Sequence, residues 1–271
     1  MSPYVCIQKA VGQTPLQALE VYRATQPDLS GVPMAYAGRL DPMASGTLLI
    51  LIGDECKKQS NYHSLDKTYR FSILFGVSSD TQDILGRLSW SKTPPKIQKR
   101  QLQKVLNILP GTLSLPYPHF SSKTVQGKPL HVWTLENRLD EITIPTQSSR
   151  IYTCSLQSIH TYSTEEIYSN ATERINSLPT VTDPRKALGA DFRRADVLAD
   201  WQNLKTEHKG HTFSVATIDC TASSGTYMRS LAEYIASRLD TQGLAFSIHR
   251  TTIGRYVPLY KQFGIWTKRF R

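Results

Sequence analysis

The pattern of apolar and polar positions along the chain predicts a series of strands. Residues 67–76 alternate in character, as a half-buried strand does. One face would carry Tyr69, Phe71, Ile73 and Phe75, and the opposite face Arg70, Ser72 and Leu74. Residues 47–52 form a continuous apolar run closed by Gly53, which predicts a buried strand. Further strands are expected over residues 4–8, 150–162 and 213–220.

Helices are expected between these strands. Thr14 supplies an N-cap and Pro15 the first helical position, so a helix should run through Leu16, Leu19, Val21 and Tyr22. Residues 55–65 predict a second helix, and residues 98–109 an amphipathic one stopped by Pro110 and Gly111. A turn at residues 223–229 leads into a helix bearing Leu231, Ile235 and Leu239. Residues 164–206 predict an irregular piece, and the alternation of strand and helix is consistent with an α+β fold.

The net charge of the chain indicates the kind of partner that it binds. The formal net charge is +10, with a pI near 9.4, on 271 residues of which 39% are hydrophobic. This composition predicts a globular chain that binds a polyanion, because neutralising phosphates releases counterions. It does not separate tRNA from rRNA, DNA or an acidic membrane.

The cysteines and the N-terminus bear on location. Cys6, Cys56, Cys154 and Cys220 are scattered without metal-ligand spacing, so a zinc site or a disulfide framework is not expected. Reduced thiols in a cytoplasmic protein are the simpler interpretation. Lys9 interrupts the apolar core that a signal peptide would need, and no run is long enough to cross a bilayer. We therefore expect neither export nor membrane insertion.

The candidate chemistry lies between Tyr36 and Lys58. Asp41 precedes Pro42, which excludes Asp41 from the helical region and holds its carboxylate in an extended loop. Residues 44–46 are small, so another segment or a ligand could approach the backbone closely. The alternative is a simple turn with an Asx-type hydrogen bond, in which Arg39 is a solvated charge.

This stretch, AYAGRLDPMASGTLLILIG, resembles the catalytic motif of pseudouridine synthases, most closely the TruB type that modifies the T-loop uridine of tRNA. Matching segments follow in the family's order. Tyr69 stands in a DK-x-Y pattern, and residues 80–86 resemble the TDT-x-D-x-x-G turn. Residues 120–128 resemble the YSALK-x-QGK segment, residues 225–229 the GTY-IR motif, and residues 245–254 the closing strand.

The resemblance implies three catalytic residues and no cofactor or metal. Asp41 would promote cleavage of the glycosidic bond after the uridine has been flipped out of the folded loop. Tyr69, which by periodicity alone would be a core aromatic, would stack on the base and serve in proton transfer. Arg229 lies in a helix that looks buried, and an inward guanidinium demands a carboxylate partner. We expect that partner to be Asp41, kept ionised at neutral pH by Arg229.

RNA-binding residues are predicted around this centre. They are Tyr36, Arg39, Lys9, Lys57, Lys123, Lys128 and Arg250. Lys9 could instead orient the catalytic loop, or be only a basic residue at a strand end. Lys123 and Lys128 could equally be loop lysines without a phosphate contact. Tyr36 stands where bacterial relatives usually carry His, so we expect binding to be retuned without loss of chemistry.

The implied fold is a mixed, largely antiparallel sheet flanked by helices, with the catalytic cleft across its middle. We expect one catalytic domain over residues 1–271, with an insertion at about 164–206 and no RNA-binding PUA domain. Arg185, Lys186, Arg193 and Arg194 in the insertion are open candidates for RNA contact. The expected substrate is the T-arm of tRNA and the expected state a monomer. The alternatives are a synthase acting on rRNA or another RNA, and a non-catalytic RNA-binding or RNA-folding protein.

Overall fold

A nine-stranded sheet forms the centre of the chain in the computed structural model, which describes residues 2–181, 190–260 and 262–270. Its main path runs in the order β1-β3-β12-β4-β11-β10-β7, with β2 paired to β3 and β13 paired to β12. The strands are β1 (Tyr4–Lys9), β2 (Met34–Ala37), β3 (Ala44–Ile52), β4 (Asp66–Phe75), β7 (Gly111–Pro116), β10 (Thr146–Ser163), β11 (Thr212–Ala222), β12 (Gly243–Tyr260) and β13 (Phe263–Phe270).

The pairing is antiparallel everywhere in this sheet except between β12 and β3. That parallel contact is short, with Ile248 opposite Ala44 and Arg250 opposite Gly46. Two small hairpins lie outside the sheet, β5 (Val77–Ser79) with β6 (Leu88–Trp90), and β8 (Thr124–Val125) with β9 (Lys128–Pro129). The parallel contact brings the loop before β3 against a strand from the other end of the chain.

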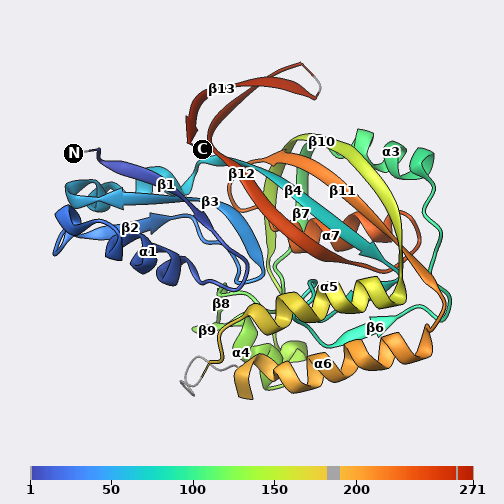
Figure 1. Ribbon diagram of the computed structural model, residues 1–271. Coiled ribbons are helices and arrows are strands. Elements are labelled where there is room, and N and C mark those ends of the chain that lie inside the picture. The colour runs from blue at the N-terminus through green and yellow to red at the C-terminus, as the bar shows by residue number, and fades with distance from the viewer. Residues whose placement is uncertain (1, 182–189, 261, 271) are drawn as a thin grey trace.

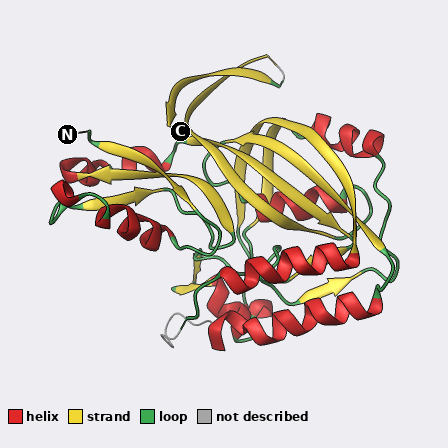
Figure 2. Cartoon of the chain, viewed as in Figure 1, coloured by secondary structure: helices red, strands yellow, loops and turns green. Residues whose placement is uncertain are grey.

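Helices lie around the sheet (Figure 2). They are α1 (Pro15–Ala24), α2 (Ser60–His63), α3 (Lys99–Ile108), α4 (Leu130–Leu135), α5 (Thr164–Ser177), α6 (Ala190–Glu207) and α7 (Met228–Ser237), with 3₁₀ turns η1 (Pro27–Leu29), η2 (Gly53–Lys58) and η3 (Leu139–Glu141). The helix α7 packs on β4 and β12, and α5 and α6 run side by side along one edge of the molecule (Figure 1). The main core joins Phe71 of β4, Trp201 of α6 and Leu231 of α7. The architecture is α+β, as the sequence predicted.

Two parts of the fold follow the sequence pattern closely. Thr14 and Gln17 form a reciprocal capping box at the start of α1. The Gln17 backbone N–H donates to the Thr14 hydroxyl, and the Thr14 backbone N–H donates to the Gln17 side-chain oxygen. The alternating segment forms β4, with Phe71 and Phe75 fully buried. Leu74, expected on the opposite face, is equally buried, because the end of β4 is covered on both sides.

Two expectations about helices were wrong. Residues 55–65 do not form one helix but the 3₁₀ turn η2 followed by the single-turn helix α2. Residues 164–206 are not irregular, because α5 and α6 occupy most of them. Ser163 caps α5 and Ile167, Ala171 and Ile175 are buried at helical spacing, a signal that the polar residues between them obscured. Asp183, Pro184, Arg185, Lys186 and Gly189 of the predicted insertion lie outside the described residues.

Beyond the expected closing strand, the chain continues as a hairpin. The strand β12 extends to Tyr260 and pairs with β13, so that Val257 lies opposite Ile265. In Figure 1 the hairpin projects beyond the rest of the sheet. Among the described residues, no helix is long and apolar enough to cross a membrane.

Candidate active site

The loop between β2 and β3 is held in place by residues from both ends of the chain. At its far end, the Lys9 ammonium donates hydrogen bonds to the carbonyl oxygens of Gln13 at 2.7 Å and Pro42 at 3.4 Å. The backbone N–H of Gly12 donates to the same Pro42 carbonyl. Lys9 is therefore buried beneath the loop, and its charge is not on the surface.

Arg250 of β12 supports the near end of the same loop. Its guanidinium donates to the carbonyl oxygens of Gly38, Arg39 and Thr47 at 3.3, 3.1 and 2.8 Å. Gly46 permits this approach, because a Cβ there would lie 2.2 Å from the Arg250 carbonyl oxygen. Arg250 is only 1% exposed, and the part of it that remains accessible lines the cavity beside the loop.

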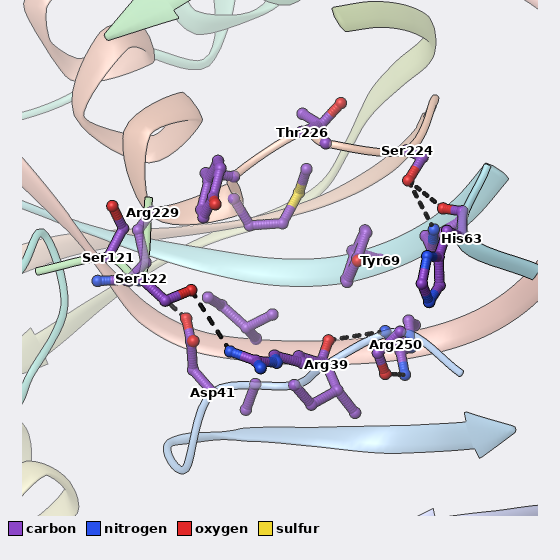
Figure 3. A pocket seen from close by; sticks show the side chains of 18 of the residues that line it. Arg39, Asp41, His63, Tyr69, Ser121, Ser122, Ser224, Thr226, Arg229 and Arg250 are labelled. Carbon is purple, nitrogen blue, oxygen red and sulfur yellow. Dashed lines mark hydrogen bonds and ion pairs between the residues drawn. The ribbon is translucent and has the colours of Figure 1, made fainter. Parts of the chain in front are cut away.

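The loop presents Asp41 to Arg229 of α7. The distance between Arg229 Nε and Asp41 Oδ2 is 2.9 Å, and the two side chains meet at one side of a cavity (Figure 3). The guanidinium also donates to the carbonyl oxygens of Thr81 and Phe120, and it lies 3.8 Å from Asp83. The pairing with Asp41 was predicted from the sequence, and the structure places the two groups in contact. Asp83, the second carboxylate, was not predicted.

Burial sets the protonation behaviour of this cluster. Burial alone would lower the pKa of Arg229, but the carboxylates of Asp41 and Asp83 raise it above its ordinary value. Burial raises the pKa of Asp83, and the Arg229 charge opposes that shift. Arg229 is therefore a permanent cation between one closed carboxylate and one that is open, since the Asp41 side chain is 44% exposed.

The cavity beside Asp41 has a volume of about 690 Å³ and is lined by Tyr69. In Figure 3, Tyr69 lies between the Asp41–Arg229 pair and a second group formed by His63, Ser224 and Arg250. Burial raises the pKa of the Tyr69 phenol, and the adjacent Arg250 charge opposes that shift. A neutral aromatic ring is thus held across the cavity from a carboxylate.

The other predicted RNA-binding residues divide into two groups. Tyr36 and Arg39 line the cavity, and an Arg39 N–H donates to the Ser122 hydroxyl at 3.4 Å. The remaining three lie outside its lining. Lys57 is paired with Asp54, Lys128 is paired with Glu136, and Lys123 lies over the ring of Tyr117. Lys57 and Lys123 are exposed, and Lys128 is partly so.

Several cavity residues were not anticipated from the sequence. Lys67 is the most informative, because it lines the cavity while being only 7% exposed. It precedes Tyr69 by two positions in the same strand, so the alternation that placed Tyr69 inward places Lys67 inward too. That signal was present in the sequence. Gln59, His131 and Tyr227 also line the cavity, from η2–α2, α4 and the turn before α7.

Two arginines of the predicted insertion that were candidates for RNA contact, Arg193 and Arg194, are engaged within the protein. Arg193 pairs with Asp80 at 2.6 Å and stacks on Phe120, whose carbonyl accepts a hydrogen bond from Arg229. Arg194 pairs with Asp191 and donates to the Leu178 carbonyl. These contacts connect α6 to the back of the candidate active site. No cluster of three or more potential metal ligands occurs among the described residues.

Comparison with known proteins agrees with this fold. Residues 30–172 match the TruB family pseudouridylate synthase (N terminal domain). The matched range contains the loop with Asp41 and the strand with Tyr69, and the chain therefore belongs to the class of pseudouridylate synthases. Within that class, this chain belongs to the TruB family.

Individual relatives give the extent of the similarity. The chain is 27% identical over 254 residues to the tRNA pseudouridine synthase B of Caldicellulosiruptor saccharolyticus, covering 94% of this chain and 68% of the relative. It is 29% identical over 161 residues to that of Syntrophus aciditrophicus, covering 59% and 49%. A solved Cbf5–Nop10–Gar1 complex contains a chain with the same fold, with a TM-score of 0.55 and 12% identity over 93% of this chain and 48% of that one. The chain thus spans between about half and two thirds of these relatives' lengths.

Proposed function

We propose that this chain is a tRNA pseudouridine synthase that isomerises the T-loop uridine, at position 55, to pseudouridine. The observation that carries the proposal is the Asp41–Arg229 pair at the wall of a cavity faced by Tyr69. The carboxylate is open to the cavity while the guanidinium behind it is buried, so the charge of Arg229 is directed at a group that can react.

The names of the similar proteins support tRNA as the substrate, since both curated relatives are called tRNA pseudouridine synthase B. The net charge of +10 supports a polyanionic partner. The T-arm as the contacted region, a monomeric state and a cytoplasmic location remain parts of the proposal. A single catalytic domain over residues 1–271 belongs to it as well.

In the proposed reaction, the target nucleotide is flipped into the cavity at a cost of a few kcal/mol in stacking, which contacts with the pocket repay. Asp41 promotes cleavage of the bond between C1′ of the ribose and N1 of the base. The detached uracil rotates and rejoins C1′ through C5, and the C5 proton is lost while N1 gains one. Tyr69 stacks on the detached base and serves in the proton transfer.

The predicted RNA contacts take two roles in this proposal. Tyr36 and Arg39 contact the flipped nucleotide or its neighbours, because both line the cavity. Lys57, Lys123 and Lys128 contact phosphates around it. Lys9 and Arg250 are reassigned to positioning the catalytic loop, since both are buried and donate to its carbonyl oxygens.

The test is incubation of the purified protein with an unmodified tRNA transcript, without added metal or cofactor, followed by mapping of pseudouridine at nucleotide resolution. Conversion confined to the T-loop uridine supports both the chemistry and the substrate. Conversion only in rRNA or another RNA would retain the chemistry and reject tRNA. Tight binding without conversion of any RNA would overturn the enzymatic proposal in favour of an RNA-binding protein.

A further inference from the structure

Two buried cations lie together in the cavity wall on the side away from Arg229. Lys67 of β4 is 7% exposed and Arg250 of β12 is 1% exposed, and both line the cavity. They converge on Gly38, where an added Cβ would lie 3.6 Å from Arg250 Nη1 and 3.8 Å from Lys67 Cε. The two charges are therefore neighbours.

The partners of these cations are neutral. The Lys67 ammonium donates to the Leu65 carbonyl and, at 3.2 Å, to the Ser224 hydroxyl. Arg250 donates to three carbonyl oxygens of the loop and of β3. Within the described ranges, neither forms an ion pair with a carboxylate within 4.0 Å, whereas Arg229 has both Asp41 and Asp83. Buried charge of one sign without a counterion indicates a site for an anion.

Hydrogen-bond donors remain available for such an anion. An ammonium has three N–H donors and a guanidinium five. The contacts above use two donors of Lys67 and three of Arg250, and the Tyr69 hydroxyl lies beside Arg250. Burial, followed by the nearby Arg250 charge, lowers the pKa of Lys67 to about 8, so the ammonium is held at an energetic cost that an anion would relieve.

We infer that Lys67 and Arg250 bind the oxygen atoms of the uracil ring and stabilise the negative charge that develops on the base. This inference rests on the proposed function. When the C1′–N1 bond breaks, its electron pair leaves with N1, and the charge is shared with the two ring oxygens. When C5 bonds to C1′, the C5 proton leaves and a proton is added at N1, which restores a neutral base. Lys67 is then a further catalytic residue, acting where charge appears in the transition state.

A phosphate of the RNA backbone fits this site less well. A phosphate stays attached to a strand that must leave the cavity, whereas Lys67 and Arg250 are almost wholly buried. Asp41, which reacts near the ribose, is at the more exposed side of the cavity. Because a flipped base enters ahead of its sugar, the closed side with the two cations receives the uracil.

The test compares Lys67→Met, Lys67→Arg and Ser224→Ala with wild type. Lys104→Met, an exposed lysine on α3, is the matched control. Single-turnover rates of pseudouridine formation are measured at saturating tRNA, together with the Kd for tRNA. We expect Lys67→Met to lower the single-turnover rate by about 10²–10³-fold, as loss of a charge-stabilising donor does, with Kd unchanged within about threefold. Lys67→Arg should recover much of the rate, because it retains the charge.

The pH profile of the same rate is a second readout. In wild type the rate should fall as the pH rises through about 8, where Lys67 loses its proton. Lys67→Arg should lack this fall. The groups that face Lys67 are Asp66 and Tyr69 on its own strand, His63 of α2, Arg250 of β12 and Asp41 of the loop. All of these remain in both proteins, so a difference between the profiles belongs to residue 67.

Other results would overturn either the inference about Lys67 and Arg250 or the proposed function. A Lys67→Met rate within about threefold of wild type would overturn the inference. So would a large loss of tRNA affinity with an unchanged rate at saturation, which would assign the cations to a phosphate. Ser224→Ala removes a hydrogen-bond partner of Lys67 but keeps its charge. If this variant lowers the rate as much as Lys67→Met does, the position of the turn that carries Ser224, and not the charge of Lys67, would be responsible. A wild-type protein that converts no RNA would instead refute the proposed function. Thermal unfolding of each variant confirms that it folds.

Discussion

The carboxylate of Asp41 and the guanidinium of Arg229 form an asymmetric pair, in which one partner is open to the cavity and the other is sealed beneath it. The Asp41 side chain is 44% exposed, whereas Arg229 is buried and also bound to Thr81, Phe120 and Asp83. These other contacts would hold Arg229 in place even when Asp41 is engaged with a substrate. The consequences of removing either partner should therefore differ.

Replacing Asp41 by Asn should abolish turnover while leaving tRNA affinity within a few-fold. The Asn amide has the same shape as the Asp carboxylate but neither its charge nor its nucleophilicity. Affinity should change little because residue 41 contacts no phosphate in the proposed complex. Pseudouridine formation and the Kd for tRNA are measured on the same preparation. Comparable activity in the variant would reject Asp41 as the catalytic residue.

Replacing Arg229 by Met should destabilise the fold as well as the site. Asp83 would be left buried without its cation, and breaking a buried pair in this way costs about 3–5 kcal/mol. Urea unfolding measures the loss. The double variant Arg229→Met with Asp83→Asn should regain part of that stability without regaining activity. A double variant no more stable than Arg229→Met would contradict the role assigned to Asp83.

Replacing Gly46 by Ala should disrupt the support of the catalytic loop. Its φ is +108°, and a Cβ would lie within 3.0 Å of three backbone atoms of Arg250. Backbone strain alone costs about 1–3 kcal/mol, and separating β3 from β12 adds to it. Gly31→Ala is the matched control, because its φ is +74° but the space beside it is open. Equal unfolding free energies for the two variants would show that the contact with β12 is unimportant.

Arg193→Met should lower stability and leave the electrostatics of RNA binding unchanged. The variant loses the ion pair with Asp80 and the stacking on Phe120, a loss of about 1–2 kcal/mol for a partly buried charge-assisted contact. The salt dependence of tRNA binding should keep its wild-type slope. Lys123→Met, which removes a proposed phosphate contact, should instead reduce the slope by about 1. A reduced slope for Arg193→Met would show that α6 meets RNA.

Lys67 should make the stability of the fold depend on pH in an unusual direction. Its pKa is lowered by burial from 10.5 to about 8, so the unfolded chain binds more protons between these values. Stability therefore rises with pH across this window. Relative to Lys67→Met, wild type should gain on the order of 3 kcal/mol between pH 7.5 and pH 10.5. If the difference in unfolding free energy between wild type and Lys67→Met stayed constant across that range, burial would not destabilise the charged form of Lys67.

Much of this site could be predicted from the sequence because several short motifs follow one another in the order of a known family. Pro42 constrains the backbone of Asp41, whereas Tyr69 was singled out by the DK-x-Y pattern, because the alternation of β4 alone predicts a core aromatic there. The pairing of Asp41 with Arg229 followed from the rule that a buried guanidinium needs a carboxylate, together with the family resemblance. The order of strand and helix signals was consistent with the α+β class, and the family resemblance implied the mixed, largely antiparallel sheet.

What could not be predicted depends on tertiary contacts. Lys9 and Arg250 look like ordinary basic residues in a chain of net charge +10, and only the packing shows that both donate to the catalytic loop. The same ambiguity concealed Lys67. The helices α5 and α6 were missed because most of their positions are polar, and their few apolar residues meet a core that the local pattern does not reveal.

The parallel contact between β3 and β12 also determines when the site can form during synthesis. The strands β1, β2 and β3 emerge first, but β3 gains its central neighbour only after β12 has been made. Pairing of segments so far apart in the chain is slow. A nascent polypeptide that ends before β12 carries Asp41 on a loop whose Gly38 and Arg39 carbonyls still lack the Arg250 guanidinium. The loop that carries Asp41 therefore gains its full support late in the folding of this chain.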